Sequence, residues 1–251
     1  MKYFLHLAYK GTNYHGWQRQ EQVSSVQATI EDDLRKMFQR DDLTIHGCGR
    51  TDAGVHASHY YAHFVVDKEI EFDLVYKLNR MLPDDIVIYD LIPVVEKANA
   101  QLDAISRTYE YHIHLKKDPF LIEKSACYDM LDLDLELMNA ATQLLTKYED
   151  FKYFCLQPEL HKHTRCLLKS VEMTVNPAQD RIFFTFTSDR FLRGMIRIIV
   201  GRLLDVGQKK VPLEELERSL ALHQPNKFIK QAYPQGLYLS EVKYREGIFE
   251  N

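Results

Sequence analysis

The stretch CGRTDAGVHA, residues 48 to 57, contains a single carboxylate, Asp52, close to Arg50 and between two glycines. General acid–base catalysis usually needs two groups of different pKa, and a metal site needs several ligands close together. One acid beside a fixed cation in a glycine-containing turn therefore has two interpretations. Asp52 either caps the loop or acts as a nucleophile.

Basic side chains are concentrated in residues 190–210, although the formal net charge of the chain is −4. This segment has six cations and one acid, Asp205. Arg193 and Arg197 are four residues apart, so one helical face could present both to a phosphate or a carboxylate. A solvated helix face explains such a cluster equally well. The six cations are Arg190, Arg193, Arg197, Arg202, Lys209 and Lys210.

Aromatic and polar residues are mixed in GTNYHGWQRQ (11–20) and SRTYEYHIH (106–114), close to Arg19 and Arg107. Such rings can stack on nucleobases. Aromatic residues in a strand more often pack against neighbouring strands, and we expect packing here. The aromatic residues concerned are Tyr14, Trp17, Tyr109 and Tyr111.

Four possible zinc ligands occur in CLQPELHKHTRC (155–166), but their spacing matches neither common zinc-finger pattern. We expect a polar loop beside two structural cysteines, and a zinc-dependent enzyme is the weaker alternative. The four cysteines of the chain are widely separated, which indicates reduced thiols. The possible ligands are Cys155, His161, His163 and Cys166, and the other cysteines are Cys48 and Cys127.

Two rounds of strand and helix patterns must position these residues. Alternating apolar residues predict strands, and apolar residues at helical spacing predict helices that Ser24, Ser25 and Asp134 are suited to cap. Asp52 falls between two predicted strands, where functional side chains are commonly held. The predicted strands are 2–9, 43–49, 60–67, 106–115, 170–176, 181–189 and 236–244, and the predicted helices are 26–38, 135–148, 191–207 and 212–222.

This repeated order predicts an α+β fold of two antiparallel halves, with helices packed on one face of the sheet. We place the boundary near residue 100, between an N-terminal half at 1–102 that carries Asp52 and a C-terminal half at 103–251. No segment approaches the roughly 20 apolar residues that span a bilayer, so we expect no membrane partner and a cytoplasmic location.

The segment GRTDAGVHA (49–57) resembles the signature of the tRNA pseudouridine synthase A family. The resemblance extends over nearly the whole chain, because six other blocks match family blocks in family order. These blocks are YFLHLAYKGTNYHGWQ, SVQATIEDDL, LNRMLPDDI, SRTYEY, FLRGMIRIIVGRLLDVG and QGLYLSEV.

The resemblance implies that Asp52 attacks the target nucleoside, so that uracil detaches from C1′, rotates and reattaches through carbon 5. Attack on C1′, addition to the base and removal of a ribose proton are all open as the first step. The resemblance also implies that Arg50 displaces the base from the RNA stack and that Arg197 pairs with the aspartate. Tyr109 matches the tyrosine beside the uracil, and Leu237 matches an apolar residue of the pocket.

For the fold, the resemblance implies two pseudo-symmetric halves whose antiparallel sheets join into one continuous sheet, with an active-site cleft between them. It further implies a homodimer that binds tRNA rather than DNA, acts on uridines 38 to 40 of the anticodon stem-loop, and uses no metal or organic cofactor. We expect Arg107 and Arg193 to bind the RNA, together with Arg19, Arg50 and the rest of the 190–210 cations.

Several positions depart from the family pattern. Asn99 and Gln101 replace a histidine and an arginine, and Gly194 and Ile198 stand where asparagine or another polar residue is common. Lys152 and Tyr153 stand where small hydroxyl residues are usual. These changes leave a second hypothesis open, in which the protein is a non-catalytic or substrate-altered RNA-binding relative.

Overall fold

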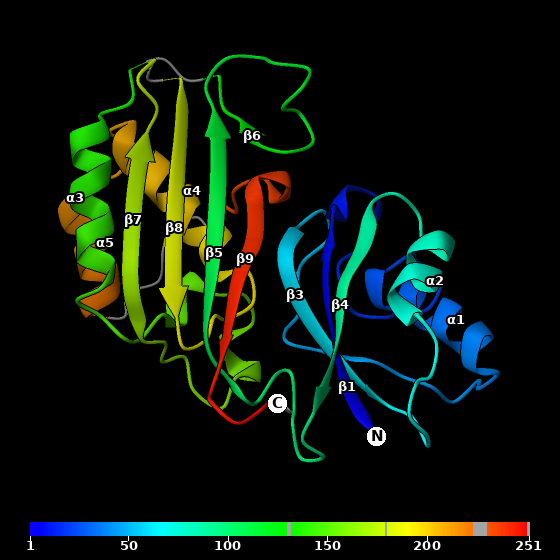
Figure 1. Ribbon diagram of the computed structural model, residues 1–251. Coiled ribbons are helices and arrows are strands. Elements are labelled where there is room, and N and C mark those ends of the chain that lie inside the picture. The colour runs from blue at the N-terminus through cyan, green and yellow to red at the C-terminus, as the bar shows by residue number, and fades with distance from the viewer. Residues whose placement is uncertain (130–131, 179, 223–229, 250–251) are drawn as a thin grey trace. The chain divides into compact units, whose positions relative to one another are not determined.

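A computed structural model of the chain describes residues 1–129, 132–178, 180–222 and 230–249 (Figure 1). Its named strands belong to one mixed sheet, and five α-helices accompany them in the described residues, which confirms the predicted α+β class. The chain divides into two compact units, Met1–Arg107 with Tyr238–Asn251, and Thr108–Leu237. No helix in these ranges is long and apolar enough to cross a membrane.

In the first unit, the strands lie in the order β4-β1-β3-β9. Strand β1 runs antiparallel to β3 and to β4, so that Leu5 faces Ala62 on one side and Leu91 on the other. Strand β9 instead runs parallel to β3, with His56 opposite Tyr238. The strands are β1 (Lys2–Tyr9), β2 (His46–Gly47), β3 (His56–Val65), β4 (Ile86–Val94) and β9 (Leu237–Tyr244).

This parallel pair joins the predicted N-terminal half, 1–102, to the last strand of the predicted C-terminal half, 103–251, whereas the strands paired within the N-terminal half run antiparallel. These two strands are far apart in the chain, so no hairpin turn fixes their relative direction. β1 lies between two strands, and Phe4 contacts Tyr244 and Phe249 at ring distances of 5.3 and 6.0 Å. Phe4 and the next residue, Leu5, point to opposite faces and are both 0% exposed, so both faces of β1 are covered.

Two helices belong to this unit, α1 (Val26–Phe38) and α2 (Leu74–Met81). The hydroxyl oxygen of Ser25 accepts from the Ala28 amide and caps α1, as predicted. The helix then buries Val26, Ile30 and Leu34 at four-residue spacing. Helix α2, which the sequence patterns did not predict, contacts both α1 and β4.

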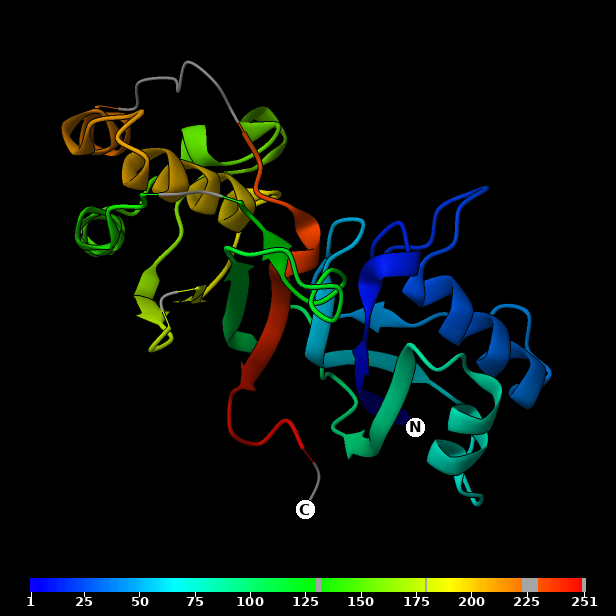
Figure 2. The ribbon, with the colours of Figure 1, turned by 90° about the horizontal axis from the view of Figure 1, so that it is seen from above.

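In the second unit, β7 and β8 form the predicted hairpin, with Val171 opposite Phe186. Strand β6 pairs in parallel with β5. Figure 2 shows the three helices of this unit on one side of its strands. The elements are β5 (Ala104–His114), β6 (Ala126–Cys127), β7 (Leu168–Val175), β8 (Arg181–Ser188), α3 (Leu135–Leu145), α4 (Met195–Gly207) and α5 (Leu213–Ala221).

Element boundaries differ from the predicted ones where local backbone geometry decides them. The predicted helix at 191–207 begins at Met195, because Gly194 has a φ of 68° and interrupts helical geometry. The predicted strand at 43–49 reduces to two residues. Four short 3-10 helices complete the named elements, at Gly11–Asn13, Lys152–Phe154, Pro158–Leu160 and Pro234–Gly236.

Candidate active site

Asp52 lies in the loop that joins β2 to β3 in the first unit. Backbone groups hold the start of this loop. The Cys48 amide donates to the Tyr61 carbonyl at 2.8 Å, and the Tyr60 hydroxyl donates to the Gly49 carbonyl. Cys48 itself is 0% exposed. The chain segment that leads to Asp52 is therefore fixed against β3.

The residues on either side of Asp52 are fixed as well. The hydroxyls of Tyr9 and Thr51 share a hydrogen bond of 2.8 Å, and the Trp17 amide donates to the Thr51 carbonyl at 3.3 Å. The Val55 amide donates to the carbonyl of Asp52 itself at 3.1 Å. Asp52 thus sits on a backbone held from several directions.

Two glycines of GTNYHGW (11–17) allow the backbone to approach this loop closely. A Cβ atom on Gly11 would lie 2.0 Å from the Val55 carbonyl oxygen, and one on Gly16 would lie 2.3 Å from the Thr51 carbonyl oxygen. Gly16 also has a φ of 89°, which favours glycine. The structure thus gives both glycines a steric role beside the loop.

Asp52 is half-buried and Arg50 is exposed. A carboxylate that combines a fixed backbone with partial exposure is preorganised yet can be reached by a ligand. Beside Arg50, a polar recess of about 190 Å³ is lined by residues that include Gln18, His46 and Gln101. This arrangement suits covalent or electrostatic action on a polar ligand better than a purely structural turn.

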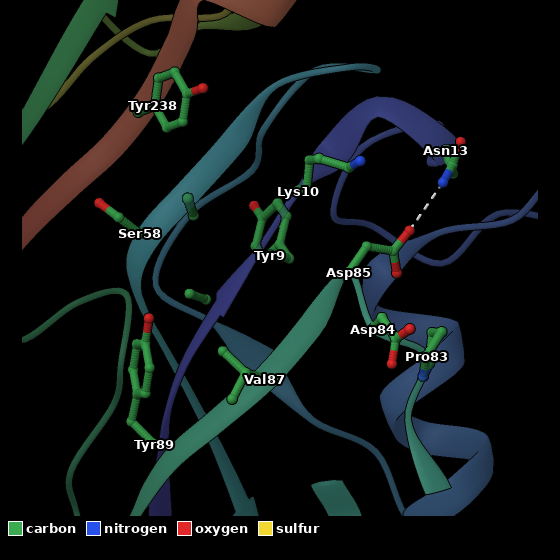
Figure 3. A pocket seen from close by; sticks show the side chains of 12 residues that line it. Tyr9, Lys10, Asn13, Ser58, Pro83, Asp84, Asp85, Val87, Tyr89 and Tyr238 are labelled. Carbon is green, nitrogen blue, oxygen red and sulfur yellow. Dashed lines mark hydrogen bonds between the residues drawn. The ribbon is translucent and has the colours of Figure 1, made fainter. Parts of the chain in front are cut away.

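Tyr9 also lines a pocket of about 570 Å³ in the first unit (Figure 3). In this view Tyr238 lies above Ser58 and Tyr89 lies below it, while Lys10 lies next to Tyr9. Nδ2 of Asn13 donates to the Asp85 carboxylate in this pocket at 3.0 Å. Tyrosine rings beside a lysine are suited to stacking with bases and attracting phosphates.

The sequence analysis did not single out Tyr9, Lys10, Tyr89 or Tyr238. Tyr9 and Lys10 had one sequence signal, since Tyr9 ends the first predicted strand and Lys10 follows it directly before GTNYHGW. Tyr89 lies on β4, which was not predicted, and Tyr238 follows Leu237 in the last predicted strand.

The second unit carries the other predicted site residues. Tyr109 is buried on β5 and meets the ring of Phe191 edge-on at 5.1 Å. Arg197 is half-buried on α4 and donates from Nε to the Ala232 carbonyl at 2.8 Å. Leu237 is buried at the start of β9.

Arg193 precedes α4, so the prediction that Arg193 and Arg197 share a helical face is wrong. The left-handed turn at Gly194 separates the two arginines. Arg193 is exposed and donates to the side-chain oxygen of Gln157 at 2.6 Å.

The expectation that all the basic side chains face RNA is also wrong. Arg202 is 4% exposed, and its Nη2 atom lies 3.5 Å from the Glu215 carboxylate. Arg19 pairs with Glu31 at 2.6 Å, and Lys209 pairs with Asp134 at 3.0 Å. Acidic neighbours within the same unit therefore take up part of the positive charge.

Arg107 is the last residue of the N-terminal segment of the first unit. Its side chain donates to two backbone carbonyls, those of Cys48 and Gln101. The Asn99 side-chain oxygen accepts from the Gln101 and Leu102 amides, both at 3.0 Å. Asn99 therefore caps a turn, while the side chain of Gln101 remains exposed.

The two cysteines of the Cys/His segment (155–166) and the ring of Trp17 are buried in the protein. Across the described ranges, no group of three or more His, Cys, Asp or Glu side chains could hold a metal ion. Cys155 and Cys166 are buried, and burial raises the pKa of their thiols to about 11 and about 12. Trp17 is 2% exposed and stacks on Tyr60 at 4.0 Å, which confirms the packing expected for it.

The chain matches a known protein family over most of its length. A family model described as tRNA pseudouridine synthase matches residues 6–98 and 141–245. The tRNA pseudouridine synthase A of Azobacteroides pseudotrichonymphae is 40% identical over 100% of this chain and 99% of that protein. The tRNA pseudouridine synthase A of Bacteroides thetaiotaomicron is 42% identical over 99% and 92%, and that of Lactobacillus acidophilus 34% identical over 98% and 95%. The chain belongs to the tRNA pseudouridine synthase family.

Proposed function

We propose that this protein is an isomerase that converts uridine to pseudouridine at positions 38 to 40 of the tRNA anticodon stem-loop. Asp52 is the nucleophile. In this reaction the N1–C1′ bond breaks, a C5–C1′ bond forms, and the hydrogen of C5 is finally replaced by one on N1. Because the nucleotide keeps its composition and oxidation state, the chemistry needs no redox or group-carrying cofactor.

The observation that carries this proposal is the surroundings of Asp52 in a chain of this family. The aspartate of GRTDAGVHA is half-buried on a backbone fixed by Tyr9, Trp17 and Tyr60. An aspartate side chain is normally ionised at neutral pH, as a nucleophile must be. The geometry supports a carboxylate whose position is set before the substrate arrives.

The remaining roles rest on the resemblance to the family. Arg197 is the cation that pairs with the aspartate, and Arg50 takes the place of the displaced base in the RNA stack. Tyr109 contacts the uracil, and Leu237 contributes apolar surface to its pocket. A base removed from its stack regains contact by packing against such side chains.

We further propose that the protein works in the cytoplasm as a homodimer with tRNA as its partner. The non-catalytic hypothesis rested on Asn99 and Gln101, where family members usually have cations. Asn99 has a structural role as the cap of a turn, so its presence does not require loss of catalysis.

The decisive experiment replaces Asp52 with asparagine. Asp52→Asn keeps the size of the side chain and removes the nucleophile, so we expect unchanged folding, near-normal tRNA binding and no detectable pseudouridine. Pseudouridine is measured by mass spectrometry of an anticodon stem-loop RNA incubated with each protein. Turnover by the variant within about tenfold of wild type would exclude Asp52 as the nucleophile.

A further inference from the structure

Arg107 connects two separate segments of the first unit through their backbones. Its Nε and Nη2 atoms donate to the Cys48 carbonyl at 3.2 and 2.7 Å, and Nη2 also donates to the Gln101 carbonyl at 2.7 Å. Cys48 begins the loop of Asp52, whereas Gln101 belongs to the turn between β4 and β5. A single guanidinium therefore joins the catalytic loop to a neighbouring turn.

The turn that contains Ala100 and Gln101 is itself held by hydrogen bonds. The Ala100 amide donates to Nδ1 of His63 at 3.1 Å, and the Ala100 carbonyl accepts from the Tyr244 hydroxyl at 2.8 Å. Asn99 caps the same turn. Arg107 thus fastens the catalytic loop to an anchored support.

The recess beside Arg50 lies between the two connected segments. Gly49 and Gln101 both line it, and each is at or next to a residue whose carbonyl Arg107 binds. The ideal Cβ position on Gly49 is 3.9 Å from Nε of Arg107, so the guanidinium lies close behind this lining. The two contacts therefore set the separation of Gly49 from Gln101 and the position from which Arg50 projects.

We propose that Arg107 is a positioning residue, which holds the loop of Arg50 and Asp52 by joining the Cys48 and Gln101 carbonyls. Its part in the reaction rests on the proposed isomerase function. Three N–H groups of the guanidinium serve these carbonyls, out of five that an arginine has. Lysine keeps the charge but lacks the planar fork that reaches two acceptors at fixed angles. This role replaces the expected one, in which Arg107 binds an RNA phosphate.

The Cys48 thiol reports directly on this connection. It is buried, its own carbonyl accepts two of the three hydrogen bonds, and burial raises its pKa to about 11. Loosening of the loop should expose it to iodoacetamide. We expect Arg107→Lys and Arg107→Met to raise the alkylation rate of Cys48 by about tenfold, measured by peptide mass spectrometry of the folded protein.

Two controls separate local loosening from general loss of stability. Cys155 and Cys166 are buried in the second unit and should keep their alkylation rates. Ser25→Ala weakens the cap of α1 within the first unit without touching Cys48 or Gln101. In Ser25→Ala, the alkylation rate of Cys48 should rise only by the factor that the loss of unfolding free energy predicts. In the Arg107 variants, the rate should rise by more than their own loss of unfolding free energy predicts.

Kinetic and binding measurements test the alternative role in phosphate binding. If Arg107 positions the loop, both variants lower kcat about tenfold, leave KM nearly unchanged and keep the salt dependence of tRNA binding. If Arg107 instead binds a phosphate, Arg107→Met reduces the slope of log K against log salt by about 0.7 to 0.9 and leaves kcat and Cys48 alkylation unchanged. That result would overturn the proposal. The alkylation assay needs no RNA, so it remains informative even if wild-type protein forms no pseudouridine and the proposed function fails.

Discussion

The buried side chain of His63 on β3 makes the hydrogen bonding of the Ala100 turn, near the Asp52 loop, sensitive to pH. It is 6% exposed, and its Nδ1 atom accepts from the Ala100 amide. Burial, with smaller contributions from His46 and Lys2, lowers the pKa of His63 from 6.5 to about 4. The ring is therefore neutral at physiological pH, and protonation at Nδ1 would break its contact with the turn.

The lowered pKa predicts that the protein loses stability in acid. Between pH 6.5 and about 4 the unfolded chain binds a proton at His63 that the folded chain does not, so the free energy of unfolding falls as pH falls. The loss from this residue approaches about 3 kcal/mol by pH 4. His63→Asn keeps an acceptor for the Ala100 amide and cannot titrate, so urea unfolding from pH 7 to 4 should fall less steeply than in wild type. Equal pH profiles would show that His63 has the same pKa in the folded and the unfolded chain.

At the scale of an element, Gly194 explains a departure from the family pattern. By the resemblance to the family it stands where asparagine or another polar residue is common, and it serves as the N-cap of α4, with a φ of 68°. Glycine and asparagine are the residues that most readily adopt this left-handed conformation. The substitution therefore preserves the backbone turn at the start of α4.

A matched pair of variants tests this explanation. Gly194→Ala and Gly194→Asn both add a Cβ about 3.1 Å from Cγ of Leu156, so that contact is common to the two. Alanine tolerates a positive φ less well, and we expect the alanine variant to be less stable than the asparagine variant by about 1 kcal/mol. Urea unfolding measures the difference. Equal stabilities would mean that α4 adjusts its first turn.

The sequence predicted elements best where a cap and a periodic apolar face coincide. For α1 both ends are correct, because Ser25 caps it and Val26, Ile30 and Leu34 recur at helical spacing. Helix α3 begins as predicted behind Asp134, whose carboxylate accepts from the Leu137 amide at 2.9 Å. Its end was placed three residues too late because no stop residue marks it.

Elements that depend on distant partners were missed or misplaced. Strand β4 gains its register from pairing with β1, and the parallel direction of β9 comes from its place beside β3. Neither feature is written in the local pattern. Hydrophobic alternation identifies a strand but does not identify its neighbours.

At the scale of the whole molecule, the candidate site shows the same difference between features that a local sequence pattern reveals and features that depend on distant contacts. Residue types and motifs identified Asp52 and Arg50, because their chemistry belongs to their own side chains. The role of Arg107 depends on the carbonyls of Cys48 and Gln101, and a carbonyl is present at every residue. The sequence can therefore propose reacting groups, whereas the contacts that hold them are seen only in the structure.

The distribution of charge over the molecule changes the expected binding of tRNA. Arg202 is buried, and Lys209 pairs with Asp134, so fewer cations remain for phosphate than the count in residues 190–210 implied. Arg193 is exposed and donates to a neutral side chain, that of Gln157, and not to a carboxylate. We therefore expect salt-sensitive binding that depends on particular arginines.

The prediction is that Arg193→Gln lowers the slope of log K against log salt by about 0.7 to 0.9, while Lys209→Gln leaves it unchanged. Gln101→Arg restores a cation at an exposed position that lines the recess beside Arg50, and it should steepen the slope by a similar amount. The measurement is a titration of each protein with an anticodon stem-loop RNA at several salt concentrations. Similar losses in the Arg193 and Lys209 variants would mean that binding follows total charge, because an ion-paired lysine would then contribute as much as an exposed arginine.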